Sequence, residues 1–134
     1  TMPPTAVPPQ TAPPTVSPYE FHANAPTCGH SGLTFLKGTV YLNKNDPSQR
    51  YVGAIVALGP PDGSTIYAME KTDGDGQYTF VLSGPGQSRE GHWGLWLVTP
   101  SSQRKSDIGG PIVTNGLPPS DPKSCWAGGV DFWK

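Results

Sequence analysis

Apolar and polar residues alternate in short runs from residue 36 to the end of the chain, with the two-residue period of a half-buried β-strand. Clusters of glycine, proline, asparagine and aspartate separate these runs, as expected of turns. The 3.6-residue period of an amphipathic helix does not occur. We therefore predict an all-β sandwich with strands at residues 36–43, 52–58, 66–71, 77–82, 92–98, 112–113 and 126–133.

The predicted strand at residues 92–98 is apolar on both faces. Trp93, Leu95 and Leu97 alternate with Trp96 and Val98. A strand of this kind is either central in its sheet or meets a partner on its outer side.

Residues 72–80 have the sequence Thr-Asp-Gly-Asp-Gly-Gln-Tyr-Thr-Phe and predict a tight hairpin turn. The Asp-Gly-Asp-Gly run supplies residues that tolerate positive φ, which a two-residue hairpin loop needs. Tyr78 and Phe80 then point to one face of the following strand, toward the core. We expect Val130 and Phe132 to be the inward pair of the last strand.

The Thr-Asp-x-Asp-Gly-x-Tyr-x-Phe pattern of residues 72–80 follows Gly38-Thr39-Val40 and Gly53-Ala54-Ile55-Val56. Together these motifs resemble the carboxypeptidase-regulatory-like and Cna-B-like domains, over about residues 36–132. The resemblance implies a seven-stranded Greek-key β-sandwich of the prealbumin or immunoglobulin-like type. Such modules occur in secreted and surface proteins and serve many roles, so the resemblance implies a fold and no particular activity.

Two cysteines, Cys28 and Cys125, bracket the predicted domain. A disulfide between them would join the first strand to the last and close a loop of about a hundred residues, worth about 4–5 kcal/mol by chain entropy. The composition is typical of a secreted protein, which favours the disulfide over the alternative of two free thiols.

The first 18 residues differ in composition from the rest. Proline pairs occur at 3–4, 8–9 and 13–14, five residues apart, and Pro18 follows. This pattern favours polyproline II and predicts an extended Pro/Thr-rich arm or linker over residues 1–27, followed by the sandwich over residues 28–134. Thr5, Thr11 and Thr15 of the arm are candidates for O-linked glycans.

Among the apolar side chains of the arm, Val7, Val16, Tyr19 and Phe21 are the candidates for assembly contacts. Tyr19 and Phe21 stand two residues apart, as in a short strand or an anchor. We expect residues 1–27 to dock on an adjacent copy of the protein.

Four aromatic residues fall on predicted outward positions or near loop ends: Tyr41, Tyr67, Trp96 and Trp126. Exposed aromatic rings stack on sugars or form protein contacts. We predict a contact surface of one of these two kinds. The alternative is that some of these residues face the core.

Asp73 and Asp75 are weak candidates for a calcium site, because the usual loop needs more carboxylates and a distal glutamate. The histidines and cysteines lack the short spacings of a zinc site. No arrangement of nucleophile, base and oxyanion donors is visible, and neither is a cofactor motif. We therefore expect a non-enzymatic protein without a cofactor.

The net charge is −1, and the nine lysines and arginines are dispersed, which argues against a nucleic-acid partner. No apolar run is long enough to cross a bilayer. We expect a processed extracellular or cell-surface protein that self-associates as a structural subunit of a fibre or surface layer. The alternative is an accessory carbohydrate- or cell-wall-binding module of a larger secreted protein.

Overall fold

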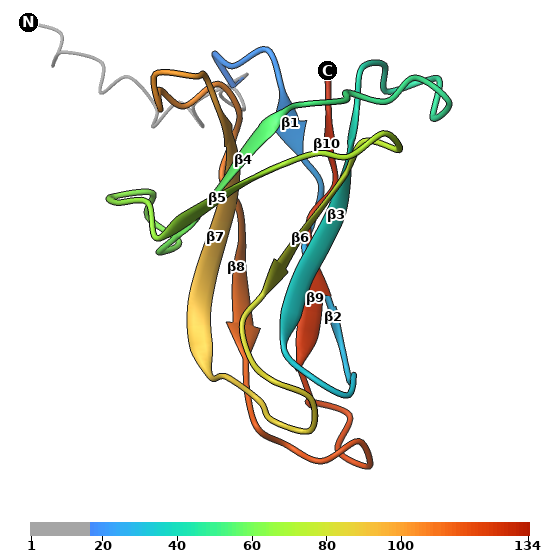
Figure 1. Cartoon of the computed structure of the whole chain (residues 1–134), viewed down its shortest axis with the longest axis vertical. Helices are drawn as coiled ribbons and strands as arrows, with labels where there is room; N and C mark the ends of the chain where they lie inside the picture. The colour runs from blue at the N-terminus through green and yellow to red at the C-terminus, as the bar shows by residue number, and fades with distance from the viewer. Residues whose placement is uncertain (1–16) are drawn as a thin grey trace, which may run out of the picture.

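The structure is a computed structural model that describes residues 17–134 (Figure 1). Within this range the chain forms ten β-strands and no helix. The strands are β1 (His22–Ala23), β2 (Thr27–Gly29), β3 (Phe35–Tyr41), β4 (Ile55–Gly59), β5 (Ala68–Lys71), β6 (Gln77–Val81), β7 (Gly91–Val98), β8 (Gly109–Thr114), β9 (Ala127–Gly129) and β10 (Phe132–Trp133). The predicted all-β sandwich is confirmed.

One sheet is built around β3. Along one edge β3 pairs antiparallel with β6, and along the other it pairs parallel with β9 and then with β10. β9 and β10 follow one another along β3, separated by residues 130–131. β2 and β1 pair antiparallel with β9 and β10 and complete this sheet. Gly129 permits the close approach of β9 to β3, since a Cβ there would lie 1.7 Å from the Lys37 carbonyl oxygen.

The second sheet is antiparallel, in the order β5, β4, β7, β8. β7 lies inside the sheet between β4 and β8, so its prediction as a central strand is confirmed. The pairing of β7 with β8 shifts register between Trp93 and Leu95. Both faces of β7 are buried, and the two sets of side chains enter different clusters.

The main core fills the space between the two sheets. Its largest buried side chains include Tyr78, Phe132, Leu36, Leu95 and Leu97, all at most 1 % exposed. Tyr78 connects β6 to the residues between β9 and β10. Its hydroxyl donates a hydrogen bond to the Val130 carbonyl oxygen (2.5 Å) and accepts one from the Val130 N–H (3.2 Å). The predicted inward positions of Tyr78, Phe80, Val130 and Phe132 are confirmed.

The strand count differs from the expected seven because a paired segment precedes residue 28 and the last strand is divided. Phe21 is 3 % exposed in the core, and β1 pairs with β10. The expected boundary between residues 27 and 28 therefore falls inside the paired segment. β1 and β2 are short, and residues 24–26 (Asn-Ala-Pro) interrupt them, so no alternating pattern marks them.

The turn at residues 73–76 is not a hairpin, which corrects the prediction from its Asp-Gly run. β5 pairs with β4 in one sheet, whereas β6 pairs with β3 in the other. The turn is therefore a corner that carries the chain from one sheet to the other (Figure 1). Gly76 has a φ of +71°, so the turn does use a left-handed residue as expected.

Candidate functional site

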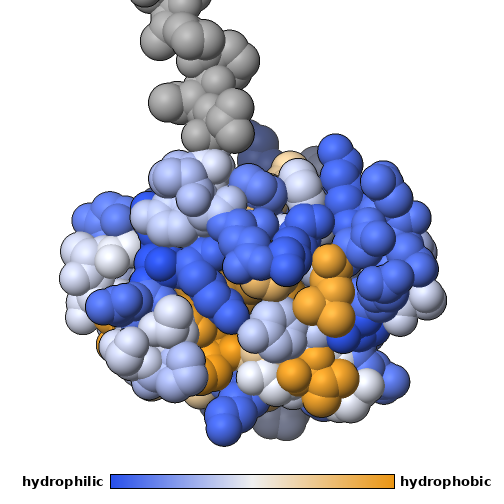
Figure 2. Space-filling view, turned by 90° about the horizontal axis from the view of Figure 1, so that it is seen from above, coloured by the Kyte–Doolittle hydropathy of each residue, from blue (hydrophilic) through white to orange (hydrophobic). Residues whose placement is uncertain are grey.

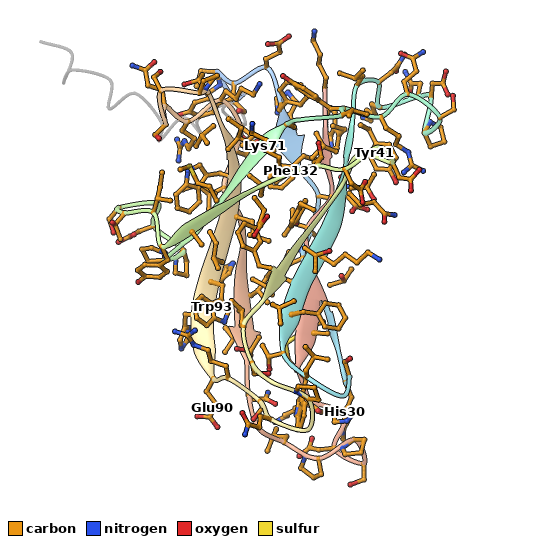
Figure 3. All side chains as sticks on the ribbon, in the orientation of Figure 1. His30, Tyr41, Lys71, Glu90, Trp93 and Phe132 are labelled. Carbon is orange, nitrogen blue, oxygen red and sulfur yellow. A yellow bond between two sulfur atoms is a disulfide. The ribbon has the colours of Figure 1, made fainter. Side chains whose placement is uncertain are left out.

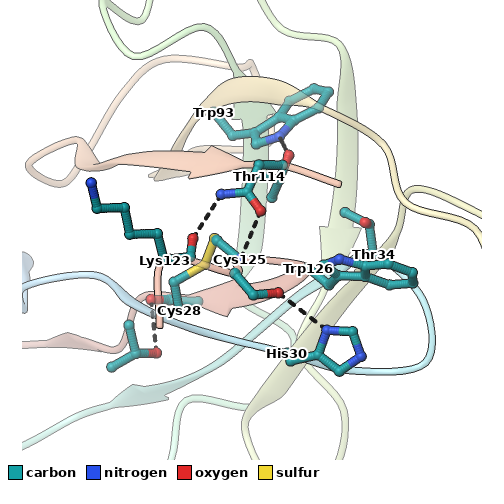
Figure 4. The surroundings of a disulfide bond; sticks show 12 residues. Cys28, His30, Thr34, Trp93, Thr114, Lys123, Cys125 and Trp126 are labelled. Carbon is teal, nitrogen blue, oxygen red and sulfur yellow. Dashed lines mark hydrogen bonds between the residues drawn. A yellow bond between two sulfur atoms is a disulfide. The ribbon is translucent and has the colours of Figure 1, made fainter. Parts of the chain in front are cut away.

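The two long sides of the sandwich, where the outer strands of the two sheets face each other, are built differently. On one side β8 lies against β2 and β9, and we call this the closed side. The disulfide between Cys28 and Cys125 joins β2 to the segment that enters β9, with a Cα–Cα distance of 5.3 Å across 97 residues of sequence (Figure 4). The predicted disulfide is confirmed.

Asn115, the residue after β8, connects the second sheet to this disulfide. Its side-chain oxygen accepts the Cys125 N–H at 3.0 Å, and its backbone N–H donates to the Cys125 carbonyl at 2.8 Å. Its side-chain NH₂ donates to the Lys123 carbonyl at 2.8 Å. Toward the other end of the closed side, Phe21 forms a parallel bridge with Ser106 and accepts the Asp107 N–H. Both ends of the closed side are therefore joined across the sheets.

The opposite side, which we call the open side, is formed by β5 and β6. Within residues 17–134 each of these strands pairs with one neighbour only. All four residues of β5 are exposed, and Met69 and Val81 are 49 % and 66 % exposed. These are free strand edges carrying apolar side chains, and such edges are where proteins accept an additional chain.

A groove of about 780 Å³ opens on this side, beside the point where β4 ends. Its apolar and aromatic lining includes Leu58, Ile66, Tyr67, Val81, Leu82 and Trp93. Arg89 and His92 add hydrogen-bond donors to the same groove. The groove thus offers both apolar contact and polar groups, the usual composition of a binding site.

Tyr67 and Trp93 form the aromatic centre of this groove. Their rings meet edge to face, with centroids 6.4 Å apart and planes at 87°. Trp93 is 6 % exposed, and its indole N–H donates to the Thr114 hydroxyl at 2.9 Å, which holds it in place (Figures 3 and 4). The Arg89 guanidinium lies 5.3 Å from the Trp93 ring centroid. Tyr67 is 59 % exposed, so its ring is the accessible part of a fixed aromatic pair.

The four aromatic residues expected to form one contact surface are distributed over the molecule. Tyr41 lies level with Trp133 at one end of β3, whereas Trp126 precedes Ala127, which lies level with Phe35 at the other end. Six residues of strand separate these levels by about 20 Å. Figure 3 shows the two ends through Tyr41 and His30, and the His30 ring packs against Trp126.

Trp96 is buried, which corrects its expected outward exposure. It is 3 % exposed and belongs to a second cluster with Ala57 and Val98, packed against Ile55, Ile66 and Ile108. This cluster lies on the outer face of the second sheet. The side-chain alternation of β7 identifies that face correctly, but residues from the flanking loops cover it.

The arm residues are placed as follows. Val7 and Val16 lie outside the described residues. Tyr19 accepts a hydrogen bond from Arg104, whose guanidinium lies 4.4 Å from the Tyr19 ring centroid. Phe21 is buried against Tyr51, with ring centroids 5.5 Å apart, and so is not available as an anchor for a neighbouring copy. It lies in the core because the segment that contains it pairs within its own sandwich.

A smaller pocket of about 370 Å³ lies at the end of the molecule that carries the C-terminus. It is lined by Asn24, Tyr41, Lys44, Pro47 and Trp133. The Trp133 indole N–H donates to the Asn24 side-chain oxygen at 2.9 Å, and Lys44 Nζ lies 4.9 Å from the centroid of the Trp133 ring. Seen from above, this end is largely hydrophilic with separate hydrophobic patches (Figure 2). Trp133 and Asn24 were not predicted, because only the pairing of β1 with β10 brings them together.

Asp73 and Asp75 serve the corner turn. One Asp73 carboxylate oxygen accepts the backbone N–H groups of Gln77 (3.0 Å) and Asp75 (2.9 Å), and these bonds lower the pKa of Asp73 below its ordinary value. The Arg50 guanidinium donates to the Asp75 carbonyl at 2.9 Å, so a cationic side chain already lies at this turn. Among residues 17–134 no three histidine, cysteine or acidic side chains are grouped as metal ligands.

His30 and Ser124 are the serine–histidine contact of the described chain, with 3.2 Å between Nδ1 and Oγ. The Ser124 hydroxyl donates to the Leu117 carbonyl at 2.8 Å and is 9 % exposed. Its proton is thus directed at a backbone oxygen of the loop, and it holds this loop rather than facing a ligand.

Comparisons with models of protein families, with curated proteins and with solved structures yield no match to this chain. Within residues 17–134 the structure contains no helix of the length and apolar character that a membrane crossing requires.

Proposed function

We propose that the chain is a non-enzymatic structural subunit of an extracellular or cell-surface assembly, and that copies associate through the open side of the sandwich. The observation that carries this proposal is the difference between the two sides. On one side backbone bonds join the two sheets at both ends, and a disulfide joins β2 to the segment entering β9. The other presents two free strand edges and an aromatic groove.

The disulfide supports the extracellular part of the proposal, because such bonds form and persist in oxidising compartments. The resemblance to carboxypeptidase-regulatory-like and Cna-B-like domains, with their Greek-key topology, belongs to the same proposal. Modules of that type occur in secreted and surface proteins.

The open edges suit an added chain better than a small ligand. Exposed edge backbone supplies regular hydrogen-bond donors and acceptors, and the flanking groove accommodates side chains. The short length of β5 and its charged Glu70 and Lys71 limit uncontrolled edge-to-edge pairing. These features favour a specific contact between copies over unspecific aggregation.

The experiment is sedimentation velocity of the full chain over a concentration series, with electron microscopy of the same samples. The proposal predicts a sedimentation coefficient that rises with concentration and regular fibres or sheets at the highest concentrations. Discrete monomers at every concentration would contradict it.

The pocket at the C-terminal end favours a second candidate function, an accessory carbohydrate-binding module. Tyr41 and Trp133 supply rings, and Asn24 and Lys44 supply hydrogen-bonding groups around them. This combination is suited to stacking on a sugar and bonding its hydroxyls. This function predicts retardation on polysaccharide affinity gels that Tyr41→Ala abolishes, whereas the structural function predicts unchanged mobility.

A further inference from the structure

We infer that the groove between β5, β6 and β7 binds the proline-rich residues 1–16 of a second copy of the chain, which would lie in it as a polyproline II segment. This inference rests on the proposed function and names its contact. It replaces the expected docking through Phe21, which is buried in its own core.

The chemistry of the groove matches a proline-rich segment. Proline rings present apolar faces, and polyproline II leaves its carbonyl oxygens without internal partners. The groove supplies aromatic and apolar contact from the exposed Tyr67 and Val81, and donors from Arg89 and His92. Docking of such segments on aromatic grooves is a recurrent mode of peptide recognition, favoured because the extended conformation is preformed.

The composition of residues 1–16 fits the same site. The segment holds six prolines in three pairs and no charged side chain. A proline pair offers adjacent apolar ring faces, and the Tyr67 ring, which is 59 % exposed, is the accessible aromatic surface on which they can pack. Of the two features of the open side, the groove suits this segment better than the free edges, because proline cannot donate a ladder hydrogen bond.

The position of the arm favours a second copy over the same molecule. The described chain begins beside Arg104, which bridges to Val98 at the end of β7. The groove lies beside Trp93, five residues earlier in β7, about 17 Å away.

An extended arm of 16 residues reaches about 50 Å, well past this distance. A polyproline II arm would place the proline pairs at 8–9 and 3–4 about 25–40 Å from residue 17, beyond its own groove and within reach of a neighbour's. An arm in one copy and a groove in the next make a head-to-tail contact, which generates a filament or a ring.

The test uses the full chain with matched substitutions and sedimentation velocity. Tyr67→Lys alters the groove, and the double substitution Pro8→Gly/Pro9→Gly alters the arm. Val52→Lys is the control, because Val52 is exposed to the same extent as Tyr67 (59 %) but lies outside this groove. We expect each of the first two variants to raise the concentration for half-assembly about tenfold or more, and Val52→Lys to leave it unchanged.

Mixing supplies the decisive observation. The arm variant keeps an intact groove, and the groove variant keeps an intact arm. An equimolar mixture should therefore form dimers at concentrations where each variant alone is monomeric. Assembly of Tyr67→Lys at the wild-type concentration, or a mixture that stays monomeric, overturns the inference while leaving the structural-subunit proposal standing. A wild-type chain that never assembles overturns the proposed function itself.

Discussion

The closed and open sides of this sandwich use different means to bring the same two sheets together. On the closed side, Asn115 and Phe21 form backbone bonds between the two sheets, and the Cys28–Cys125 disulfide joins β2 to the segment entering β9 within one of them. On the open side, the sheets are linked by the chain itself, through the corner at residues 73–76. The groove lies at the other ends of these two strands, beside Ala68 of β5 and Val81 of β6.

This difference shows how a small domain can combine stability with an accessible edge. The cross-link restricts the unfolded chain without occupying the opposite edge. β5 and β6 can then remain unpaired, although free edges contribute less to stability than paired ones. The predictions below test whether stability resides on the closed side and binding on the open side.

The largest expected effect comes from removing the disulfide. The double substitution Cys28→Ser/Cys125→Ser should lower the free energy of unfolding by about 4–5 kcal/mol, because the unfolded chain regains the freedom of a long loop. Urea unfolding monitored by tryptophan fluorescence measures this. Val81→Thr on the open side is the control and should change stability by less than about 0.5 kcal/mol. Equal effects of the two changes would remove the distinction between the sides.

Trp96 and Tyr67 form a second matched pair, since both were expected to be exposed. Trp96→Ala should destabilise the fold by about 3–5 kcal/mol, because it empties the cluster on the outer face of the second sheet. Tyr67→Ala should cost less than about 0.5 kcal/mol, since its ring is largely exposed, while it weakens assembly. Thermal unfolding and sedimentation of the same two proteins separate these outcomes. A large stability loss for Tyr67→Ala would place the groove in the structural core.

Tyr78→Phe tests the hydrogen bonds that connect β6, on the open side, to Val130 between β9 and β10. The change leaves the buried Val130 N–H and carbonyl without the hydroxyl and should cost about 1–3 kcal/mol.

Burial also raises the pKa of Tyr78 well above its ordinary value of 10.0. Above pH 10 the unfolded chain therefore loses this proton while the folded protein retains it, so the contribution of Tyr78 to stability is present below pH 10 and falls as pH rises. Melting curves from pH 8 to pH 11 should show a steeper alkaline loss for the wild type than for Tyr78→Phe. Parallel curves for the two proteins would contradict this assignment.

The smallest effect is expected at the corner. Because hydrogen bonds lower the pKa of Asp73, its contribution is present above the ordinary value of 3.8 and is lost as pH falls through the lower folded pKa. Asp73→Asn keeps an acceptor for the Gln77 and Asp75 N–H groups but does not titrate in this range. The variant should melt close to the wild type at pH 7 and show a weaker acid-induced decrease in melting temperature below pH 4. A large loss at pH 7 would indicate that the carboxylate charge itself holds the corner.

Much of the fold was predictable because the positions of the strands depend on patterns of neighbouring residues. Alternation located the strands from β3 onward and the inward side chains of β6 and β10. The hairpin prediction was wrong because an Asp-Gly turn has the same local chemistry whether the next strand pairs with the previous one or crosses to another sheet. Thr72 illustrates the missing information: its hydroxyl donates to the Tyr51 carbonyl and accepts the Ala54 N–H, contacts that span about twenty residues of sequence.

The candidate groove was predictable only in part. Tyr67 was identified as an exposed aromatic residue, but no pattern associates it with Trp93, which contacts its ring, or with Arg89, which lies against Trp93. They come together because β4 ends before it reaches the start of β7, so the first residues of β7 have no neighbour from β4. This arrangement depends on the lengths of three strands at once. Likewise, the apolar outer face of β7 was visible in the sequence, while the loop residues that cover Trp96 were not.

By itself the amino-acid sequence determined the strand class, the composition of the arm and the two cysteines available for a bond, because these depend on neighbouring residues and on residue type. The tertiary structure decided which strands pair, which aromatic rings are buried, and which side of the sandwich stays open. Those features depend on contacts between segments far apart in the chain, and their free energies appear only once the two sheets have packed together.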